Sequence, residues 1–131
     1  MIDCSKFCVM PGFVDAHTHA VFYGDRSKEY DMKLNGMGYY EIYNEGLGIR
    51  YTTNSVANST VEELAVHLDR YLPRMSKLGT TTVEIKSGYG LDAENEVKML
   101  KAIEVARKKY QKELTIVSTF CGAHAIPKGK T

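Results

Sequence analysis

Hydrophobic positions along the chain form three strand-like runs, at Cys8–Asp15, Thr80–Ile85 and Leu114–Phe120. The runs are short and contain β-branched or aromatic residues, which favour strands in a buried sheet. Stretches with helical spacing separate them. The order strand, helix, strand, helix, strand predicts an α/β fold with a parallel sheet and crossover helices, and both a barrel and an open doubly wound sheet have this pattern.

The first predicted helix begins at Thr60, whose hydroxyl can cap the amide of Glu63 while the Glu63 carboxylate reaches back, forming a capping box. Apolar side chains then recur at three-and-four spacing, which places them on one helix face. They are Leu64, Leu68, Tyr71, Leu72 and Met75. Pro73 lies inside this pattern and removes a helical hydrogen bond, so we expect a kink or an early end there, before Gly79 stops the helix.

A second helix is predicted to follow the turn Gly88-Tyr89-Gly90, with Asp92 as its cap. Its apolar positions also recur at helical spacing. They are Val97, Leu100, Ile103, Val105 and Tyr110. The pattern before the first helix is weaker and predicts two short helices, at Ser27–Leu34 and Tyr39–Glu45, separated by glycines. A long structureless loop would be unusual in a compact domain, so we expect part of this region to lie over a functional site.

The composition is that of an ordinary globular domain, with 131 residues, 44% of them hydrophobic and 25% charged. The 17 lysines and arginines nearly balance the 16 acidic residues, and neither sign forms a block, which argues against nucleic acid or a membrane surface as the partner. No segment approaches the ~20 apolar residues of a membrane span. The three cysteines are spread along the chain, which predicts no disulfide framework and favours a cytoplasmic setting. We interpret Cys4 and Cys8 as ordinary thiols.

His17 and His19 are the first candidates for chemistry. In a strand, residues two apart point to the same face, so both imidazoles converge there together with Asp15. Two neutral imidazoles held by backbone geometry suit two corners of a zinc or iron(II) site. The alternative is a pair of surface histidines near a turn. Their position at the end of a buried-looking strand, where α/β proteins place their sites, favours the metal interpretation.

Glu84 and Lys86 share one face of the second strand, and Val83 and Ile85 share the other. In a barrel the aliphatic face packs against helices, so the charged face would point inward, where charges need partners. A buried ion pair and a direct functional role both remain open for this pair.

Three further residues follow strands or lie near them. Tyr89 can donate a hydrogen bond to a substrate above the sheet, and His124 offers a third imidazole at the same rim. Arg26 can hold a carboxylate through its planar fork, or it can be an exposed arginine paired with Asp25. His67 is predicted to lie on the solvated surface. A cluster of tyrosines, interpreted as packing, contains Tyr39, Tyr40 and Tyr43.

The segment from Pro11 to His19 follows the pattern Pro-Gly-apolar-apolar-Asp-x-His-x-His and resembles the first barrel strand of the amidohydrolase superfamily. Three later stretches resemble the imidazolonepropionase family, in the same order. They are Gly24-Asp25-Arg26, Thr81–Leu91 and Phe120–Gly129. The resemblance extends over essentially the whole chain.

This resemblance implies the first portion of a TIM-like (β/α)₈ metallo-dependent hydrolase barrel, with residues 1–131 forming about half of the catalytic barrel. The rest of the barrel and a small flanking β domain would lie outside this chain. The implied activity is hydrolysis of the cyclic amide 4-imidazolone-5-propanoate to N-formimidoyl-L-glutamate in histidine degradation, with one zinc or iron ion.

The resemblance also implies roles for particular residues. His17 and His19 would be metal ligands, Arg26 would bind the propanoate, and Tyr89 and His124 would contact the substrate around its ring. The remaining ligands and the catalytic acid or base are expected beyond residue 131, so we expect the chain alone to have little or no hydrolase activity. A homodimer is one expectation for the longer protein.

Two alternatives stay open. One is another amidohydrolase, such as a cyclic-amide hydrolase or a deaminase, although the segment Lys86–Gly90 argues against it. The other is a non-catalytic truncated product.

Overall fold

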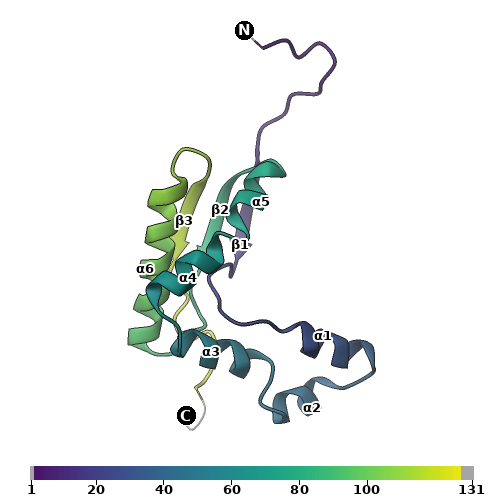
Figure 1. Ribbon diagram of the computed structural model, residues 1–131, viewed down its shortest axis with the longest axis vertical. Helices are drawn as coiled ribbons and strands as arrows, with labels where there is room; N and C mark the ends of the chain where they lie inside the picture. The colour runs from purple at the N-terminus through teal and green to yellow at the C-terminus, as the bar shows by residue number, and fades with distance from the viewer. Residues whose placement is uncertain (1, 128–131) are drawn as a thin grey trace.

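A computed structural model of the chain describes residues 2–127. Its strands β1 (Phe13–Thr18), β2 (Thr80–Lys86) and β3 (Thr115–Thr119) form a three-stranded sheet in the order β1-β2-β3. Both pairs of neighbouring strands are parallel. Figure 1 shows the strands side by side, with their carboxyl ends at the same edge. The parallel α/β sheet expected for the first part of a TIM-like barrel is therefore confirmed.

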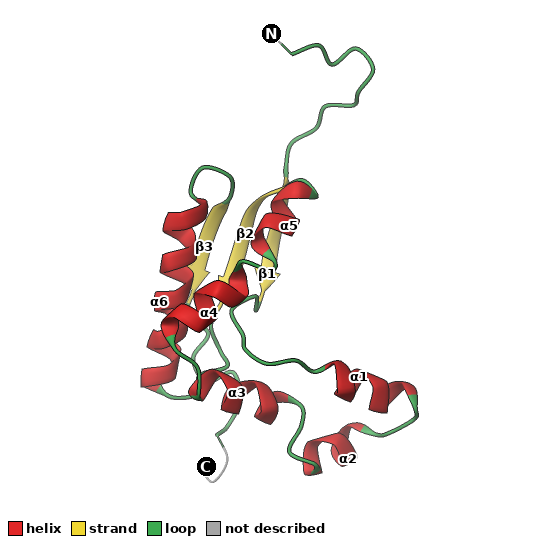
Figure 2. Cartoon of the chain, viewed as in Figure 1, coloured by secondary structure: helices red, strands yellow, loops and turns green. Residues whose placement is uncertain are grey.

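The helices connect these strands or extend beyond them (Figure 2). Their bounds are α1 (Ser27–Leu34), α2 (Tyr39–Asn44), α3 (Ile49–Ala57), α4 (Val61–Leu68), α5 (Leu72–Lys77) and α6 (Ala93–Tyr110). Both short helices predicted after the first strand are present. The sequence pattern gave no indication of α3, because its threonines, asparagine and serine have low helix propensity. In residues 2–127, every helix is too short or too polar to cross a membrane.

The first strand begins later than predicted. The run Cys8–Asp15 was expected to be extended, but β1 starts at Phe13, whose N–H donates to the Gly79 carbonyl at 2.9 Å. The described residues before Phe13 are exposed and do not pair with another strand. Pro11 also has no N–H to donate to a partner. The strand continues to Thr18, so His17 lies within it and His19 directly after it.

Pro73 ends the first predicted helix early, as expected. Helix α4 starts with the predicted capping box, in which Glu63 N–H donates to Thr60 Oγ1 at 3.1 Å and Thr60 N–H donates to the Glu63 carboxylate at 2.8 Å. It ends at Leu68, and α5 begins at Leu72 with Pro73 in its first turn. A proline is tolerated there because first-turn N–H groups have no helical acceptor.

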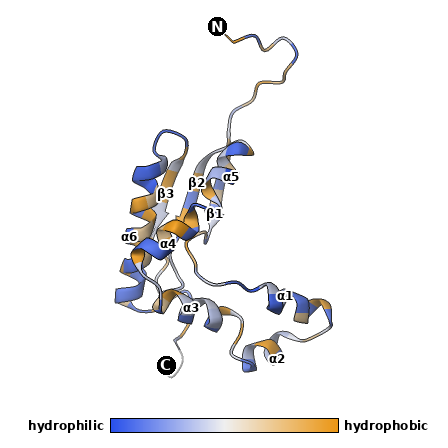
Figure 3. Ribbon diagram, viewed as in Figure 1, coloured by the Kyte–Doolittle hydropathy of each residue, from blue (hydrophilic) through white to orange (hydrophobic). Residues whose placement is uncertain are grey.

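The hydrophobic core lies between the sheet and the helices α4 and α6. Val83 and Ile85 of β2 are fully buried, which confirms that the aliphatic face of this strand meets the helices. Figure 3 shows mixed hydropathy along α6, as expected for a helix with one buried face. That face differs from the prediction, because Val97 and Val105 are about half exposed. The buried positions are Glu96, Met99, Ala102, Ile103, Ala106 and Tyr110.

Candidate functional site

Side chains from three chain segments meet at the carboxyl edge of the sheet. The ring centroids of His19 and Tyr89 are 5.3 Å apart, those of His19 and His124 are 4.7 Å apart, and those of Tyr89 and His124 are 5.9 Å apart. His19 follows β1, Tyr89 follows β2 and His124 follows β3. Because parallel strands end at one edge, these loops are brought together from distant parts of the sequence.

His17 lies beside this group and is exposed. Its ring centroid is 5.7 Å from that of His19, and the two rings are arranged edge to face. Its backbone N–H donates to Asp15 Oδ1 at 3.4 Å. The structure thus places the predicted imidazole pair at neighbouring positions, with His17 on the solvent side.

His19 has the properties of an available metal ligand. Its Nδ1 atom is buried and has no hydrogen-bond partner within residues 2–127. Burial is the main cause that lowers the pKa of His19, and the nearby His124 lowers this pKa further. A low pKa favours the neutral imidazole, which is the form that binds metals. An orphaned buried nitrogen in a group of imidazoles therefore fits the metal ion that the sequence resemblance implies.

Cys121 joins this group, and the sequence interpretation did not select it. Its Sγ atom is 3.8 Å from Nδ1 of His124. One ligand atom from each of His19, Cys121 and His124 lies within 4.8 Å of the other two. The spacing of Cys121 and His124, with two residues between them, was a sequence signal that could have identified the pair.

Glu96 holds the loop that carries Tyr89, and sequence reasoning also missed this residue. The buried carboxylate accepts hydrogen bonds from the N–H groups of Gly88 at 2.9 Å, Gly90 at 2.8 Å and Leu91 at 3.0 Å. Leu91 has a φ of 60°, a conformation that a side chain rarely adopts without such support. The predicted cap is also present. Asp92 precedes the first residue of α6, and its Oδ1 accepts a hydrogen bond from Asn95 N–H at 2.8 Å.

Ser87 and Gly88 position the loop after β3. Ser87 is fully buried, and its hydroxyl accepts a hydrogen bond from Cys121 N–H at 3.0 Å. Gly88 has a φ of +121°, and a Cβ atom there would lie 3.2 Å from both Cys121 O and His124 Cβ. Glycine is therefore required for the close approach of the two loops.

Arg26 pairs with Glu29 and not with Asp25. Its Nε donates to the Glu29 carboxylate at 2.8 Å, and its Nη2 makes a second contact with the other oxygen. Glu29 is only 3% exposed and also accepts from Lys33 Nζ at 3.1 Å and Gly48 N–H at 2.8 Å. Two cations thus share one buried carboxylate, which leaves a net positive charge at this position.

Acidification is expected to remove the stabilisation that Glu29 provides. The hydrogen bond from Arg26 is the main reason that the pKa of Glu29 falls from 4.5 to about 2, and Lys33 and Gly48 add to the effect. The Glu29 carboxyl therefore binds a proton less tightly in the folded chain than in the unfolded chain. The contribution is therefore complete above pH 4.5 and is lost as the pH falls towards 2. A shift of this size corresponds to on the order of 3 kcal/mol.

Urea unfolding of the chain and of a Glu29→Gln variant measures this contribution. At about pH 7 we expect the unmodified chain to be more stable. The difference should decrease as the pH is lowered through the range below 4.5. A difference that does not change with pH would contradict the role assigned to the ionised carboxylate.

Glu84 and Lys86 form an ion pair on the sheet face opposite the helices. Both side chains are largely buried, with relative exposures of 15% and 20%. Glu84 Oε2 is buried and has no hydrogen-bond partner in the described part of the chain. The structure therefore shows the ion pair that the sequence left as one of two possibilities, and among the described residues Glu84 Oε2 remains without a partner on this face of the sheet.

One prediction about a histidine side chain was wrong. His67 is not on the surface, since it is 6% exposed and its Nδ1 lies 2.8 Å from the Phe22 carbonyl. It packs edge to face on the rings of Phe22 and Tyr71. The tyrosine cluster packs as predicted, since the Tyr39 ring contacts the rings of Tyr40 and Tyr43, but Tyr39 and Tyr40 are 64% and 78% exposed and so pack on the surface of α2.

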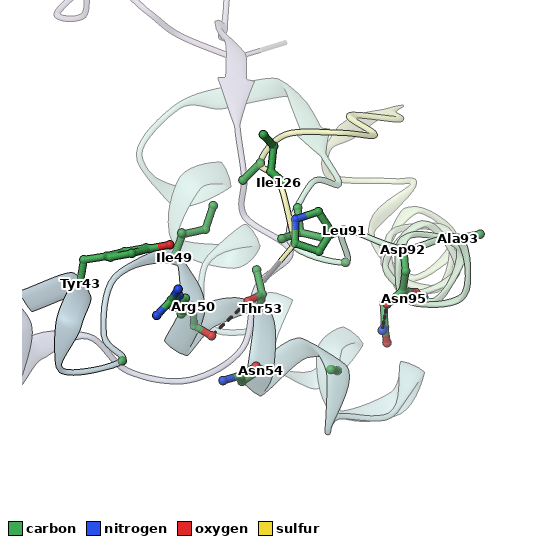
Figure 4. A pocket seen from close by; sticks show the side chains of 15 residues that line it. Tyr43, Ile49, Arg50, Thr53, Asn54, Leu91, Asp92, Ala93, Asn95 and Ile126 are labelled. Carbon is green, nitrogen blue, oxygen red and sulfur yellow. Dashed lines mark hydrogen bonds between the residues drawn. The ribbon is translucent and has the colours of Figure 1, made fainter. Parts of the chain in front are cut away.

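A cavity of about 700 Å³ lies next to the rim, between α3 and the loops after β2 and β3 (Figure 4). Arg50, Thr53 and Asn54 line it from α3. The Arg50 guanidinium stacks on the Tyr43 ring, 4.1 Å from its centroid. The opposite wall includes Gly90 to Ala93 and Ala125 to Pro127, so the loops that carry Tyr89 and His124 also form the cavity.

Comparison with known proteins identifies the relatives of this chain. A protein described as "Probable imidazolonepropionase" from Homo sapiens is 51% identical over 131 residues, which are 100% of this chain and 30% of the relative. Proteins with the same description from Nematostella vectensis and Dictyostelium discoideum are 52% identical over 130 residues and 51% identical over 129 residues. Those alignments cover 99% and 98% of this chain.

The chain spans about 30% of the length of these curated relatives. No family model matches it. About half of the residues are identical to the human relative over the whole chain, which agrees with the order of the motifs along the sequence. The chain belongs to the imidazolonepropionase family.

Proposed function

We propose that the chain supplies part of the active site of a metal-dependent hydrolase that converts 4-imidazolone-5-propanoate to N-formimidoyl-L-glutamate. The convergence of His19, Tyr89 and His124 at the carboxyl edge of a parallel sheet supports this proposal. The names of the relatives support the same reaction class.

His17 and His19 would hold one zinc or iron ion. The two imidazoles are neighbours at the end of β1, and His19 offers a buried nitrogen without a partner. When bound, such an ion polarises the ring carbonyl and lowers the pKa of a bound water. The surrounding residues of this chain bind and orient the substrate.

Arg26 would bind the propanoate group. Glu29 takes one edge of the guanidinium, and the other edge keeps N–H donors suited to a planar carboxylate. Because Lys33 shares the Glu29 charge, the position still attracts an anion. Tyr89 can donate its hydroxyl proton in a hydrogen bond to the ring, and His124 can contact the ring from the other loop.

The test is a chimaera in which these 131 residues replace the matching segment of the human relative. Hydrolysis of 4-imidazolone-5-propanoate is followed in the chimaera and in the unmodified relative. We expect activity in both, and we expect an Arg26→Lys variant of the chimaera to have a raised KM, because lysine cannot make a bidentate pair.

The same assay tests the alternatives. Turnover of hydantoin or cytosine in place of the imidazolone would assign the chain to another amidohydrolase reaction. An inactive chimaera that is folded, beside an active relative, would mean that this segment does not support catalysis.

A further inference from the structure

We propose that Lys86 is a further catalytic residue of the hydrolase, which stabilises the negative charge that develops on the substrate as its ring is opened, and that Glu84 is its positioning residue. The inference rests on the proposed function and adds these two residues to it. The sequence left a buried ion pair and a direct functional role open for this pair, and here the ion pair serves the function.

Lys86 ends the central strand of the sheet, at the level of the rim. In the ladder between β1 and β2, Ile85 pairs with Thr18, the residue directly before His19. In the ladder between β2 and β3, Lys86 itself pairs with Thr119, the last residue of β3. Lys86 therefore lies between the ends of both neighbouring strands, where the loops with the candidate site residues begin.

The Lys86 side chain lies on the sheet face opposite the helices. Ile85 is fully buried in the core, so its neighbours Glu84 and Lys86 point to the other face. The Lys86 side chain is nevertheless only 20% exposed. After burial and the nearby His124, the charge of Lys86 is a further cause that lowers the pKa of His19, as expected for an ammonium group close to that ring.

Glu84 holds the ammonium group in this place. Its Oε1 atom accepts a hydrogen bond from Lys86 Nζ. Burial raises the pKa of Glu84, but Lys86 and the Thr119 hydroxyl lower it by more, so the carboxylate is ionised at neutral pH. An ammonium group has three N–H donors, and Glu84 Oε1 takes one of them, so donors remain for a substrate oxygen.

The ion pair is a poor device for stability. Removing two charges from water costs free energy that one contact seldom returns, and apolar residues of similar volume often give an equally stable fold. Glu84 Oε2 adds to this cost, because it is buried without a hydrogen-bond partner in residues 2–127. A cation held at such a cost beside the candidate site favours a role in the reaction.

The proposed reaction produces negative charge on the ring carbonyl oxygen. Water adds to the carbonyl carbon, and the π electrons of the C=O bond move to this oxygen. The ring carbon–nitrogen bond then breaks as the C=O bond re-forms, and the nitrogen leaves with that bond's electron pair and one proton of the water. The new carboxyl group releases its remaining proton to solvent. A fixed N–H donor stabilises the negative oxygen more than the neutral carbonyl.

The experiment is steady-state kinetics of the chimaera and of its Lys86→Met, Glu84→Gln and double variants. Loss of one preorganised donor to such an oxygen typically lowers kcat about a hundredfold or more, so we expect this loss in Lys86→Met, with little change in KM. Glu84→Gln should lower kcat by a smaller factor. In the double variant it should have no further effect, because Glu84 acts through Lys86.

Thermal unfolding separates this role from a purely structural one. Lys86→Met leaves a buried carboxylate without its partner and should lower Tm, whereas the double variant removes both charges and should restore Tm. A double variant that is stable but slow is the result expected here, with unchanged metal content. Thr82→Val is the matched control on the same strand face, farther from the rim, and should keep kcat and Tm.

Three results would overturn the assignment of Lys86: normal kcat in Lys86→Met, recovery of kcat together with Tm in the double variant, or loss of the metal from Lys86→Met. In each of these cases an active unmodified chimaera would leave the proposed function standing. An inactive but folded unmodified chimaera would instead overturn the proposed function, and this inference with it.

Discussion

Replacing His17 and His19 together with alanine is expected to reduce hydrolysis by the chimaera at least about a hundredfold. Loss of a residue that merely orients a metal ligand typically costs tenfold to about a hundredfold, so removing two ligands should cost more. The variant should also lose the metal that copurifies with the chimaera. Hydrolysis rates and elemental analysis of the same preparations measure both effects.

The control for this variant is Tyr40→Ala, which removes an exposed side chain of α2 that lies outside the rim. Its activity and metal content should match those of the unmodified chimaera. If the double histidine variant keeps its metal and its rate, the imidazole pair at the end of β1 has no role in the reaction, and the proposed metal centre is wrong.

Replacing Glu96 with alanine is expected to destabilise the chain by about 3 kcal/mol or more. The substitution leaves the N–H groups of Gly88, Gly90 and Leu91 without their acceptor, and a buried unsatisfied donor costs about 1–3 kcal/mol. The loop between β2 and α6 should then lose its order, and Tyr89 would no longer be held beside His19. Urea unfolding measures the first effect, and amide hydrogen exchange of Gly90 and Leu91 measures the second.

Glu94→Ala is the matched control for Glu96→Ala. Both glutamates lie in the first turn of α6, where a negative charge interacts favourably with the helix dipole, but Glu94 is exposed. Its replacement should change stability by less than about 0.5 kcal/mol. Equal effects of the two substitutions would show that the dipole, and not the hydrogen bonds to the loop, accounts for the role of Glu96.

Much of the local structure could be predicted because it depends on residues that are close in sequence. The capping box at Thr60, the cap at Asp92 and the early helix end at Pro73 all involve contacts within a few positions. The alternation of strands and helices predicted a parallel sheet because a crossover helix returns the chain in the same direction. The start of β1 was misplaced because a strand needs a partner, and the ladder begins only where Phe13 meets Gly79.

Side-chain environments set by distant segments could not be predicted in this way. His67 looked like a surface residue in the helical pattern, yet Phe22 and Tyr71 cover it. In α6 the spacing of apolar residues was compatible with more than one buried face. Packing against α4 and the sheet selected the face that buries Met99 and Ile103 and leaves Val97 half exposed.

The sequence by itself determined the α/β order, the helix boundaries set by caps and proline, and the presence of an imidazole pair at a strand end. Only the tertiary structure decided which loops meet at the rim. The strand order β1-β2-β3 and its register bring Cys121 and His124 to His19 and place Glu96 under the Tyr89 loop. The physical reason is that hydrogen bonds and apolar periodicity act between near neighbours in sequence, whereas a site depends on the packing of strands that are far apart in it.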